Sequence, residues 1–468
     1  MSDLAKLCAL DAAAKVRSGE VTASEVVEAT LARIAALNGK LGAFTDVTAE
    51  RARAKAGALD AAKARGEALG PLAGATFAVK NLFDVEGLPT RAGSKINRER
   101  APASADATLI TKLEAAGAIL VGALNMGEYA YDFTGENAHD GPSRNPHDLG
   151  AMSGGSSGGS GSAVGGGLVP LALGSDTNGS IRVPSALCGV YGLKPTYGRL
   201  SRARSFPFVS SFDHLGPFAR SVGDLAAAYD AMQGVDADDP GQTPRAIEPT
   251  FGALAQGAGG LRIATLGGYF AKGAEPAVFE GLERVARALG VSRVVELPEA
   301  GRARAAAFLI TMAEGGALHL DRLKTRADDY DPDTRDRLLA GTMLPAAWVV
   351  KAQKLRRWFR AQALALFKEV DVLLAPATPV RAPALGQKTF LLDGAQIPVR
   401  ANLGLFTQPI SFIGLPVVAV PLWRPGSLLP TGVQVIAPPW REDLALRVAA
   451  QLERDGVTRA PIGRAAEV

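Results

Sequence analysis

Near its N-terminus the chain has two segments whose polar and apolar positions follow a helical pattern. Over residues 22–37 apolar side chains recur every three or four positions, and Thr22 and Glu25 have the spacing of a capping box. Residues 46–68 are rich in Ala, Lys, Arg and Glu, which is typical of a solvated helix on the outside of a molecule. Both segments are therefore expected to be helices.

Short apolar runs follow, and they alternate with a further helical segment. GATFAVKNLFDV (74–85) begins as a buried strand and has Lys80 at the C-terminal end of that strand, where α/β sheets place their chemistry. Asp106 is expected to cap a helix that Gly117 closes, and AILVG (118–122) predicts a second strand. This strand–helix–strand order indicates an α/β fold.

The rest of the chain continues to alternate between strand and helix patterns. The polar segment 126–148 is expected to be a loop that lines a cleft. The pattern then predicts a turn and helix at 213–233, a strand–helix–strand unit at 261–266, 275–289 and 294–297, mostly helix at 314–369, strands at 371–379, 417–422 and 432–439, and a last helix at 442–453.

Strands from both ends of the chain are expected to share one large sheet, mixed and mostly parallel, with helices on its faces. No internal repeat or linker interrupts the pattern. The sequence therefore predicts a single α/β domain over residues 1–468, with a core at about 74–220 and a helical excursion at about 300–370.

A glycine–serine block lies between the N-terminal and the C-terminal groups of predicted strands. Residues 153–167 read SGGSSGGSGSAVGGG, and eight of the fifteen are glycine. Residues without a Cβ let a backbone pass close to itself and turn its N–H groups toward one point. An apolar stretch follows, and then GSDTNGSIRVPSALCGVYGLKP, which contains Ser180.

Composition and charge exclude several classes of protein. The chain is 47% hydrophobic and 21% charged, as expected of a globular protein with a large core. Its formal net charge of +4 is spread along the chain, so nucleic-acid binding is not indicated. The two cysteines, Cys8 and Cys188, do not form a disulfide framework or a metal site. With no signal-peptide pattern and no apolar run long enough to cross a bilayer, we expect a soluble cytoplasmic protein.

Ser180 and Lys80 are the candidates for chemistry. A serine hydroxyl is a poor nucleophile until a base removes its proton. Histidine is the usual base, but no histidine lies in a recognisable triad setting and the G-x-S-x-G elbow is absent. Lys80 is the best-placed alternative, because a buried lysine can lose its proton. The histidines are interpreted as loop or packing residues: His139, His147, His214 and His319.

The block GGSSGGSGSAVGGGLVPLALGSDTNGSIRVPSALCGVYGLKPTYGRLS resembles the signature of the amidase signature family. AVKNLFDV, LLAPATP, GLPVVAVPL and GVQVIAPP extend the resemblance over nearly the whole chain. The resemblance implies the amidase-signature fold and a Ser-cisSer-Lys triad, which maps onto Ser180, Ser156 and Lys80. Ser156 lies 76 residues after Lys80 and 24 before Ser180, as in that family. A cis peptide before Ser156, an acyl-enzyme on Ser180, and the need for neither a metal nor an organic cofactor are also implied.

The resemblance further implies an oxyanion hole, and one position in it departs from the family pattern. The backbone N–H groups of Thr177, Asn178, Gly179 and Ser180 would form the hole. The family commonly has two glycines before the nucleophile, whereas this chain has Asn178–Gly179. Asn tolerates positive φ better than most residues, and its amide could bind a polar substrate. Otherwise Asn178 is a tolerated turn residue without a substrate contact.

Together with SFPFVSSFDHLGPFARS (205–221), the Asn178 variant resembles the branch of the family that acts on biuret-type compounds, the 1-carboxybiuret hydrolases of cyanuric acid degradation. Tyr131 and Asp132 are candidates to accept the N–H groups of a urea-like substrate. Arg182 could bind a substrate carboxylate, but we favour an ion pair with Asp176 that braces the nucleophile loop.

The sequence thus predicts an amide hydrolase that releases ammonia from a small urea-like amide. The alternative is the glutaminase A-type subunit of an aminoacyl-tRNA amidotransferase, which shares the signature. A phosphate-binding module is set aside because G-x-x-x-x-G-K-[ST] is absent. The resemblance implies that a small helical subunit can pair with the chain, and we expect an oligomer. Direct contact with nucleic acid or with a membrane is not expected.

Overall fold

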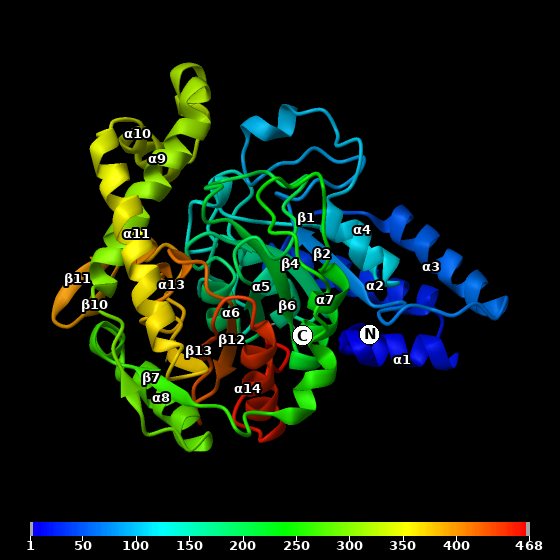
Figure 1. Ribbon diagram of the computed structural model, residues 1–468. Coiled ribbons are helices and arrows are strands. Elements are labelled where there is room, and N and C mark those ends of the chain that lie inside the picture. Colours follow the sequence, from blue (N-terminus) through cyan, green and yellow to red (C-terminus); the bar gives the residue numbers. More distant parts are fainter. Residues whose placement is uncertain (1–2, 465–468) are drawn as a thin grey trace.

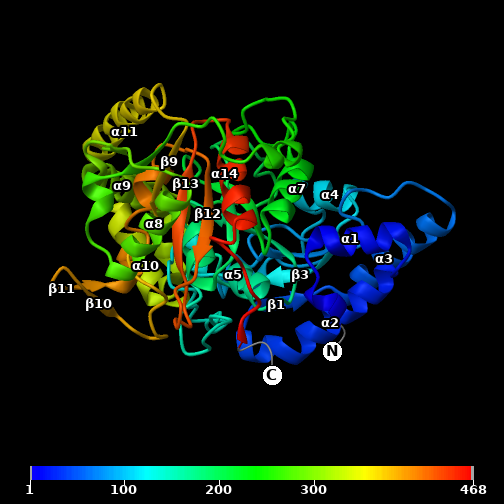
Figure 2. The same ribbon diagram turned by 90° about the horizontal axis from the view of Figure 1, so that it is seen from below.

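The computed structural model describes residues 3–464, and at its centre is an 11-stranded sheet (Figures 1 and 2). In spatial order the strands are β1 (Phe44–Val47), β3 (Ile119–Leu124), β2 (Thr76–Lys80), β4 (Leu171–Asp176), β6 (His214–Ala219), β5 (Tyr191–Lys194), β12 (Val417–Leu422), β13 (Thr431–Ile436), β9 (Val372–Pro376), β7 (Ile263–Leu266) and β8 (Val294–Val295). A separate hairpin consists of β10 (Thr389–Leu392) and β11 (Ala395–Pro398). Strands from both ends of the chain share the large sheet, as expected.

The sheet is mixed, but its antiparallel pairs outnumber its parallel pairs. Strand β2 is parallel to β3 and β4, and β7 is parallel to β8 and β9. The six other pairs are antiparallel, including all those from β4 to β9 across the centre. The expectation of a mostly parallel sheet is therefore wrong. Unbroken apolar runs are typical of parallel strands, yet β12 and β13 are buried along their whole length because helices pack against them.

Helices surround the sheet. They are α1 (Ala9–Ser18), α2 (Ala23–Leu41), α3 (Ala49–Ala64), α4 (Thr108–Ala115), α5 (Gly158–Gly165), α6 (Arg182–Cys188), α7 (Val222–Met232), α8 (Pro276–Ala288), α9 (Ala300–Arg326), α10 (Pro332–Thr342), α11 (Ala346–Leu366), α12 (Val399–Asn402), α13 (Gln408–Ser411) and α14 (Glu442–Arg454). Helices α1 to α3 lie at one end of the molecule, and α9 to α11 project at the opposite end (Figure 1). Among the described residues no helix is both long and apolar enough to span a membrane.

Most predicted elements are present, and two local predictions are corrected. Helix α2 begins as its capping box predicts, since Glu25 N–H donates to the Thr22 side chain and Thr22 N–H donates to the Glu25 carboxylate. Asp106 does not cap α4, because its carboxylate accepts hydrogen bonds from Arg51 instead. Residues 214–219 form strand β6 rather than the expected turn.

The expected helical excursion corresponds to α9, α10 and α11, and hydrogen bonds join α9 to the loops that follow the central strands. The side-chain amide of Asn178 donates to Thr311 Oγ1 over 2.8 Å, and Ser211 N–H donates to the Glu314 carboxylate over 3.1 Å. These contacts hold α9 against the loop after β4, which carries Asn178, and against the segment before β6, which carries Ser211. The single-domain organisation stays a prediction.

Candidate active site

Lys80 is the last residue of β2, and its side chain is fully buried. Its amine donates hydrogen bonds to Ser156 Oγ over 2.7 Å and to Ser175 Oγ over 2.9 Å. Ser175 belongs to the adjacent strand β4, whereas Ser156 lies in the glycine–serine block. The predicted proximity of Lys80 and Ser156 is therefore present, with Ser175 as a second neighbour that the sequence did not reveal.

The surroundings of Lys80 favour its uncharged form. Burial lowers the pKa of Lys80 from 10.5 to about 7, because removal from water disfavours the ammonium ion. The carboxylates of Asp213, Asp176 and Asp132 oppose that shift, in decreasing order of effect. Near neutral pH a substantial fraction of Lys80 is therefore uncharged and able to accept a proton.

The backbone around Ser156 is tightly confined. The Gly155–Ser156 peptide bond is cis, as the family resemblance implies. A Cβ added to Gly155 would lie only 2.4 Å from Asp132 Oδ2, so this position admits no side chain without displacing that carboxylate. The glycines of the block thus provide close approach of the backbone, as the sequence suggested.

Ser180 lies in the loop between β4 and α6, and it lines a small cavity of about 20 Å³. Four of the predicted substrate-binding or oxyanion-hole residues line the same cavity: Thr177, Asn178, Tyr131 and Asp132. The Ser180 hydroxyl has no hydrogen-bond partner in the described part of the chain. The backbone N–H groups of residues 177–180 likewise donate to no other group there, so they are free to bind an oxyanion.

A buried ion pair braces this loop. Arg182 donates from Nε and Nη2 to the two carboxylate oxygens of Asp176, each over 3.0 Å, and both side chains are completely buried. Burial alone would raise the pKa of Asp176, but the Arg182 guanidinium holds it well below its usual range. The expected bracing pair is confirmed, and Arg182 is thereby occupied.

Asn178 adopts a different backbone conformation from the one expected. Positive φ occurs at Gly179 (145°) and not at Asn178, so tolerance of positive φ is not the reason that asparagine fits here. A Cβ on Gly179 would lie 2.2 Å from Thr407 Oγ1, which explains the glycine. The Asn178 amide nitrogen donates to Thr311, while its Oδ1 is buried without a hydrogen-bond partner among the described residues.

The carboxylate of Asp132 is largely satisfied within its own loop, unlike the Tyr131 hydroxyl. Asp132 accepts hydrogen bonds from the N–H groups of Thr134 and Gly135 over 2.9 and 2.7 Å, and from the Thr134 hydroxyl over 2.8 Å. The Tyr131 hydroxyl is buried without a partner in the described chain, and burial raises the pKa of Tyr131 to about 12. Tyr131 is therefore the freer of the two polar groups.

Two arginines that sequence reasoning missed also line the cavity with Ser180: Arg337 of α10 and Arg400 of α12. The Arg337 guanidinium lies 3.9 Å from the centre of the Tyr131 ring and donates to the Tyr131 carbonyl oxygen. Arg400 lies 3.4 Å from the Asp132 carboxylate. Both stand far from the signature in the sequence, in segments without a motif, so only the folded chain brings them to the site.

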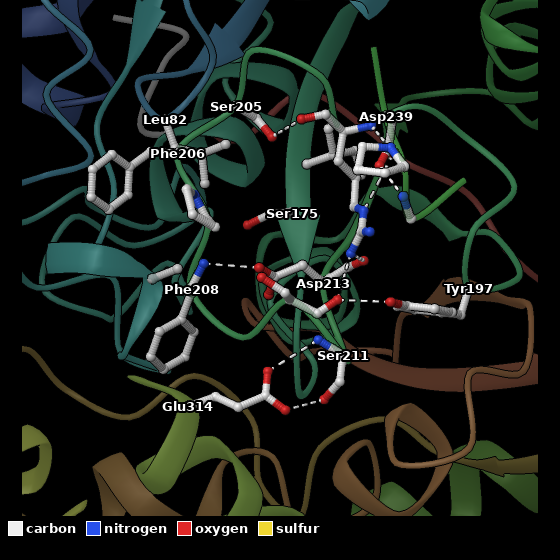
Figure 3. A pocket seen from close by; sticks show the side chains of 17 residues that line it. Leu82, Ser175, Tyr197, Ser205, Phe206, Phe208, Ser211, Asp213, Asp239 and Glu314 are labelled. Atoms are coloured by element: carbon white, nitrogen blue, oxygen red, sulfur yellow. Dashed lines mark hydrogen bonds and ion pairs between the residues drawn. The ribbon is translucent and has the colours of Figure 1, made fainter. Parts of the chain in front are cut away.

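A second, larger cavity of about 560 Å³ (Figure 3) shares part of its lining with the first. Ser175 and Asp213 line it, so it reaches the neighbourhood of Lys80 from another side. Asp213 accepts hydrogen bonds from the Thr177 hydroxyl over 2.6 Å and from Phe208 N–H over 2.8 Å. Ala130 and Phe208 line both cavities.

The histidines do not line the cavity that contains Ser180, which agrees with their interpretation as loop or packing residues. Each has a ring nitrogen within hydrogen-bond distance of a structural neighbour. The pairs are His139 with Glu128, His147 with the Cys188 carbonyl, His214 with the Asp176 carbonyl, and His319 with the Tyr330 hydroxyl.

The chain is similar to known proteins along nearly its whole length. The sequence model of the Amidase family matches residues 25–446. AtzE of Pseudomonas sp. (strain ADP), which is a 1-carboxybiuret hydrolase subunit, is 55% identical over 446 residues, which cover 95% of this chain and 97% of that protein. The A-type subunit of the glutamyl-tRNA(Gln) amidotransferase of Anaeromyxobacter dehalogenans (strain 2CP-C) is 39% identical over 484 residues, with 97% of each chain covered.

Among solved structures, one described as a vestigial protein complex that reveals the evolutionary origins of an s-triazine catabolic enzyme superposes with a TM-score of 0.96. It is 53% identical in sequence, and the match covers 97% of this chain and 100% of that one.

Proposed function

The chain belongs to the amidase family and hydrolyses amide C–N bonds, and from that premise we propose that Lys80, Ser156 and Ser180 form its proton relay and nucleophile. The observation that supports this assignment is the buried amine of Lys80, 2.7 Å from Ser156 Oγ, beside the loop that carries Ser180. A neutral amine in that position is the base that a serine nucleophile requires.

The reaction then proceeds through an acyl-enzyme. Ser180 Oγ attacks the amide carbonyl carbon and gives its proton to Ser156, which passes its own proton to Lys80. The N–H groups of residues 177–180 bind the resulting oxyanion. The C–N bond breaks, and the leaving nitrogen takes the proton back through the same relay and departs as ammonia. Water hydrolyses the ester on Ser180 by the reverse proton path and releases a carboxylic or carbamic acid.

The substrate that the site fits best is a small urea-like amide with a carboxylate, 1-carboxybiuret, or biuret itself. Arg337 and Arg400 supply positive charge beside Ser180, which suits a carboxylate. Asn178 Oδ1 and the Tyr131 hydroxyl are unpartnered polar atoms that suit the N–H and C=O groups of a ureido chain. The similarity to a component of a 1-carboxybiuret hydrolase supports the same substrate.

The second candidate is a glutaminase component of an aminoacyl-tRNA amidotransferase, because the A-type subunit of a glutamyl-tRNA(Gln) amidotransferase is 39% identical over nearly the whole chain. Glutamine also carries a carboxylate that an arginine could bind. Asn178 argues against this candidate, since the family pattern there is glycine and the asparagine side chain occupies part of the cavity wall.

We also propose that the chain works in an oligomer or with a small helical partner subunit. The support is indirect: the 55%-identical relative is described as one subunit of an enzyme, and the 53%-identical structure as a complex. Light scattering of the purified chain, alone and co-expressed with small proteins encoded beside it, tests this proposal by mass. A chain that remains a monomer and retains full activity would contradict it.

Ammonia release from a small panel of amides tests the proposed function. The panel contains biuret, glutamine, and 1-carboxybiuret generated in place by ring opening of cyanuric acid. We expect kcat/KM for the biuret compounds to exceed that for glutamine by at least about 100-fold. A poorly matched substrate leaves buried polar groups of the site unpaired, and this raises the free energy of its transition state. Arg337→Met should lower kcat/KM for 1-carboxybiuret more than for biuret, which lacks the carboxylate.

Ser180→Ala is the control for the mechanism and should abolish turnover of every amide in the panel. Near-normal activity of that variant would remove the proposed nucleophile. Preference for glutamine in the presence of partner subunits would replace the biuret proposal with the second candidate.

A further inference from the structure

Phe208 stands between the cavity that contains Ser180 and the much larger cavity that contains Ser175. It lines both, and Ala130 is the one other residue common to their linings in the described chain. Ala130 contributes only a methyl group, so the Phe208 ring is the main side-chain barrier between about 20 Å³ on one side and about 560 Å³ on the other. In Figure 3 Phe206 and Phe208 lie on one side of the larger cavity, and Tyr197 and Asp239 lie on the other.

The Phe208 ring is held in place from several directions. Its centre lies 4.8 Å from that of the Tyr131 ring, with the two rings tilted by 46°, and the Arg337 guanidinium packs on Tyr131 in turn. A Cβ on Gly315 of α9 would lie 3.0 Å from the Phe208 ring, which shows how closely the helix passes. The Phe208 N–H donates to the buried carboxylate of Asp213. A side chain fixed by neighbours on two elements is a rigid partition.

We propose that Phe208 is the size filter of the active site: its ring confines the part of the substrate beyond the reacting carbonyl to the small cavity. The proposal rests on the proposed function in taking Ser180 as the nucleophile. It also predicts a latent activity. Without the ring, the two cavities join, and an amide with an aryl or branched alkyl substituent can reach Ser180.

The lining of the larger cavity indicates which substituents it would take. Leu82, Phe206 and Leu215 give it apolar walls, while Ser175 and Tyr197 add hydroxyl groups. Its charged lining residues already have partners in the protein: Arg202 with Asp239, Asp213 with Thr177, and Glu314 with Ser211. Apolar walls with a few polar groups are typical of sites for small aromatic or aliphatic groups. The amides that Phe208 excludes are therefore those with an apolar substituent the size of a ring. The wild-type enzyme should reject these amides and accept biuret.

The test compares two reagents that report directly on access to Ser180. Methanesulfonyl fluoride and phenylmethanesulfonyl fluoride react by the same chemistry: a bond forms from Ser180 Oγ to sulfur, the S–F bond breaks, fluoride leaves, and the serine proton passes to the Ser156–Lys80 relay. Intact-protein mass gives the rate of each labelling, and peptide mapping identifies the labelled serine. The ratio of the phenyl to the methyl rate measures the size limit.

Phe208→Ala should raise that ratio by at least about tenfold over wild type, because a hydrophobic pocket discriminates one or a few carbon atoms by about that factor. Phe208→Leu, which retains more packing, should give a smaller increase, and it keeps the test valid if the alanine variant does not fold. Phe206→Ala is the matched control: Phe206 is two residues away and lines the larger cavity alone, so the ratio should stay at the wild-type value. Hydrolysis of 1-phenylbiuret relative to biuret should change in the same order.

The outcomes separate the filter from the proposed function. Equal labelling ratios in wild type, Phe208→Ala and Phe208→Leu would overturn the filter while Ser180 remained the nucleophile. An equal rise in Phe206→Ala would also overturn it, because general loosening would then explain the effect. If neither reagent labels Ser180 in the wild type, the proposed nucleophile fails and the filter fails with it. If the labelling ratio rises but biuret is not hydrolysed, the filter stands and the assigned substrate is wrong.

Discussion

Lys80 has to be uncharged to accept a proton, so its neighbours set the pH range of activity. With a pKa of about 7, Lys80 gains a proton as the pH falls, and kcat/KM should decline below about pH 7. Asp213→Asn removes the carboxylate that most favours the ammonium form and keeps an oxygen for the Thr177 hydroxyl. The pKa of Lys80 then falls, and the acid limb of the pH profile should move to lower pH by roughly one unit.

The measurement is kcat/KM for biuret between about pH 5 and pH 9. Asp239→Asn is the control, since Asp239 lines the same large cavity but does not contribute to the shift at Lys80. A limb that stays in place in Asp213→Asn, or moves upward, would contradict the assignment of Lys80 as the base.

The burial of Lys80 should also lower the free energy of unfolding of the protein. Its pKa is about 10.5 in the unfolded chain and about 7 in the folded protein, so between these values the unfolded state binds more protons and wild-type stability rises with pH. Lys80→Met should therefore raise the free energy of unfolding at pH 7 by on the order of 3 kcal/mol, with loss of turnover. Urea unfolding at pH 7 and near pH 10 checks this, because the gain should shrink at the higher pH.

At the scale of single residues, the sequence predicted those that belong to one contiguous motif or end a recognisable strand. Ser156 and Ser180 lie in the glycine–serine block and its continuation, and Lys80 ends an apolar run, so all three could be singled out from the sequence. The hydrogen bond from Lys80 to Ser156 confirms that those two lie close together. Arg337 and Arg400 could not be, because nothing in a local pattern shows which distant helix will cover a cavity. The backbone conformation of Asn178 could not be predicted either, since the positive φ occurs at its neighbour Gly179.

At the scale of elements, the junction of β4 and α6 depends on the buried pair of Asp176 and Arg182. Arg182→Met leaves the Asp176 carboxylate buried without its partner, and we expect the free energy of unfolding to fall by about 3–5 kcal/mol. Adding Asp176→Asn should recover part of the loss, because the unpaired charge is then removed. Arg262→Met is the comparison: Arg262 pairs with Asp371 at the surface and is 54% exposed, so its loss should cost less than about 1 kcal/mol.

Chemical denaturation of the single and double variants decides this prediction. A loss at Arg182 no larger than that at Arg262 would show that the buried pair does not brace the nucleophile loop. Equal losses in Arg182→Met and in the double variant would show that the unpaired charge is not what destabilises the protein.

Periodicity identified most elements but gave no strand directions. An apolar run such as VVAVPL shows burial on both faces, and burial is the same whether the neighbouring strand runs parallel or antiparallel. The majority of antiparallel pairs could therefore not be anticipated. Strand β6 was missed for another reason: HLGPFA contains Gly and Pro, which usually indicate a turn, yet every residue of it is buried in the sheet.

At the scale of the whole molecule, the helical excursion and the sheet should unfold together. Helix α9 contributes Thr311 and Glu314 to hydrogen bonds with loops of the core, and Asp331 N–H at the start of α10 donates to Glu128. Because these contacts are shared, calorimetry should show one cooperative transition, as the single-domain prediction requires. A separate early transition, with loss of α9–α11 protection in hydrogen exchange, would instead indicate two units.

The interleaved strand order has a consequence for how the chain is made. Strand β5 lies in the middle of the sheet, but its partner β12 follows it by roughly 220 residues. Strand β9 is likewise made before its partner β13. At about 5–20 residues per second, a ribosome needs about 10 to 45 s to make that interval. Throughout that time the nascent chain exposes open strand edges in what will become its core. Strands β12 and β13 therefore close the sheet, and the protein is vulnerable to aggregation until both have been made.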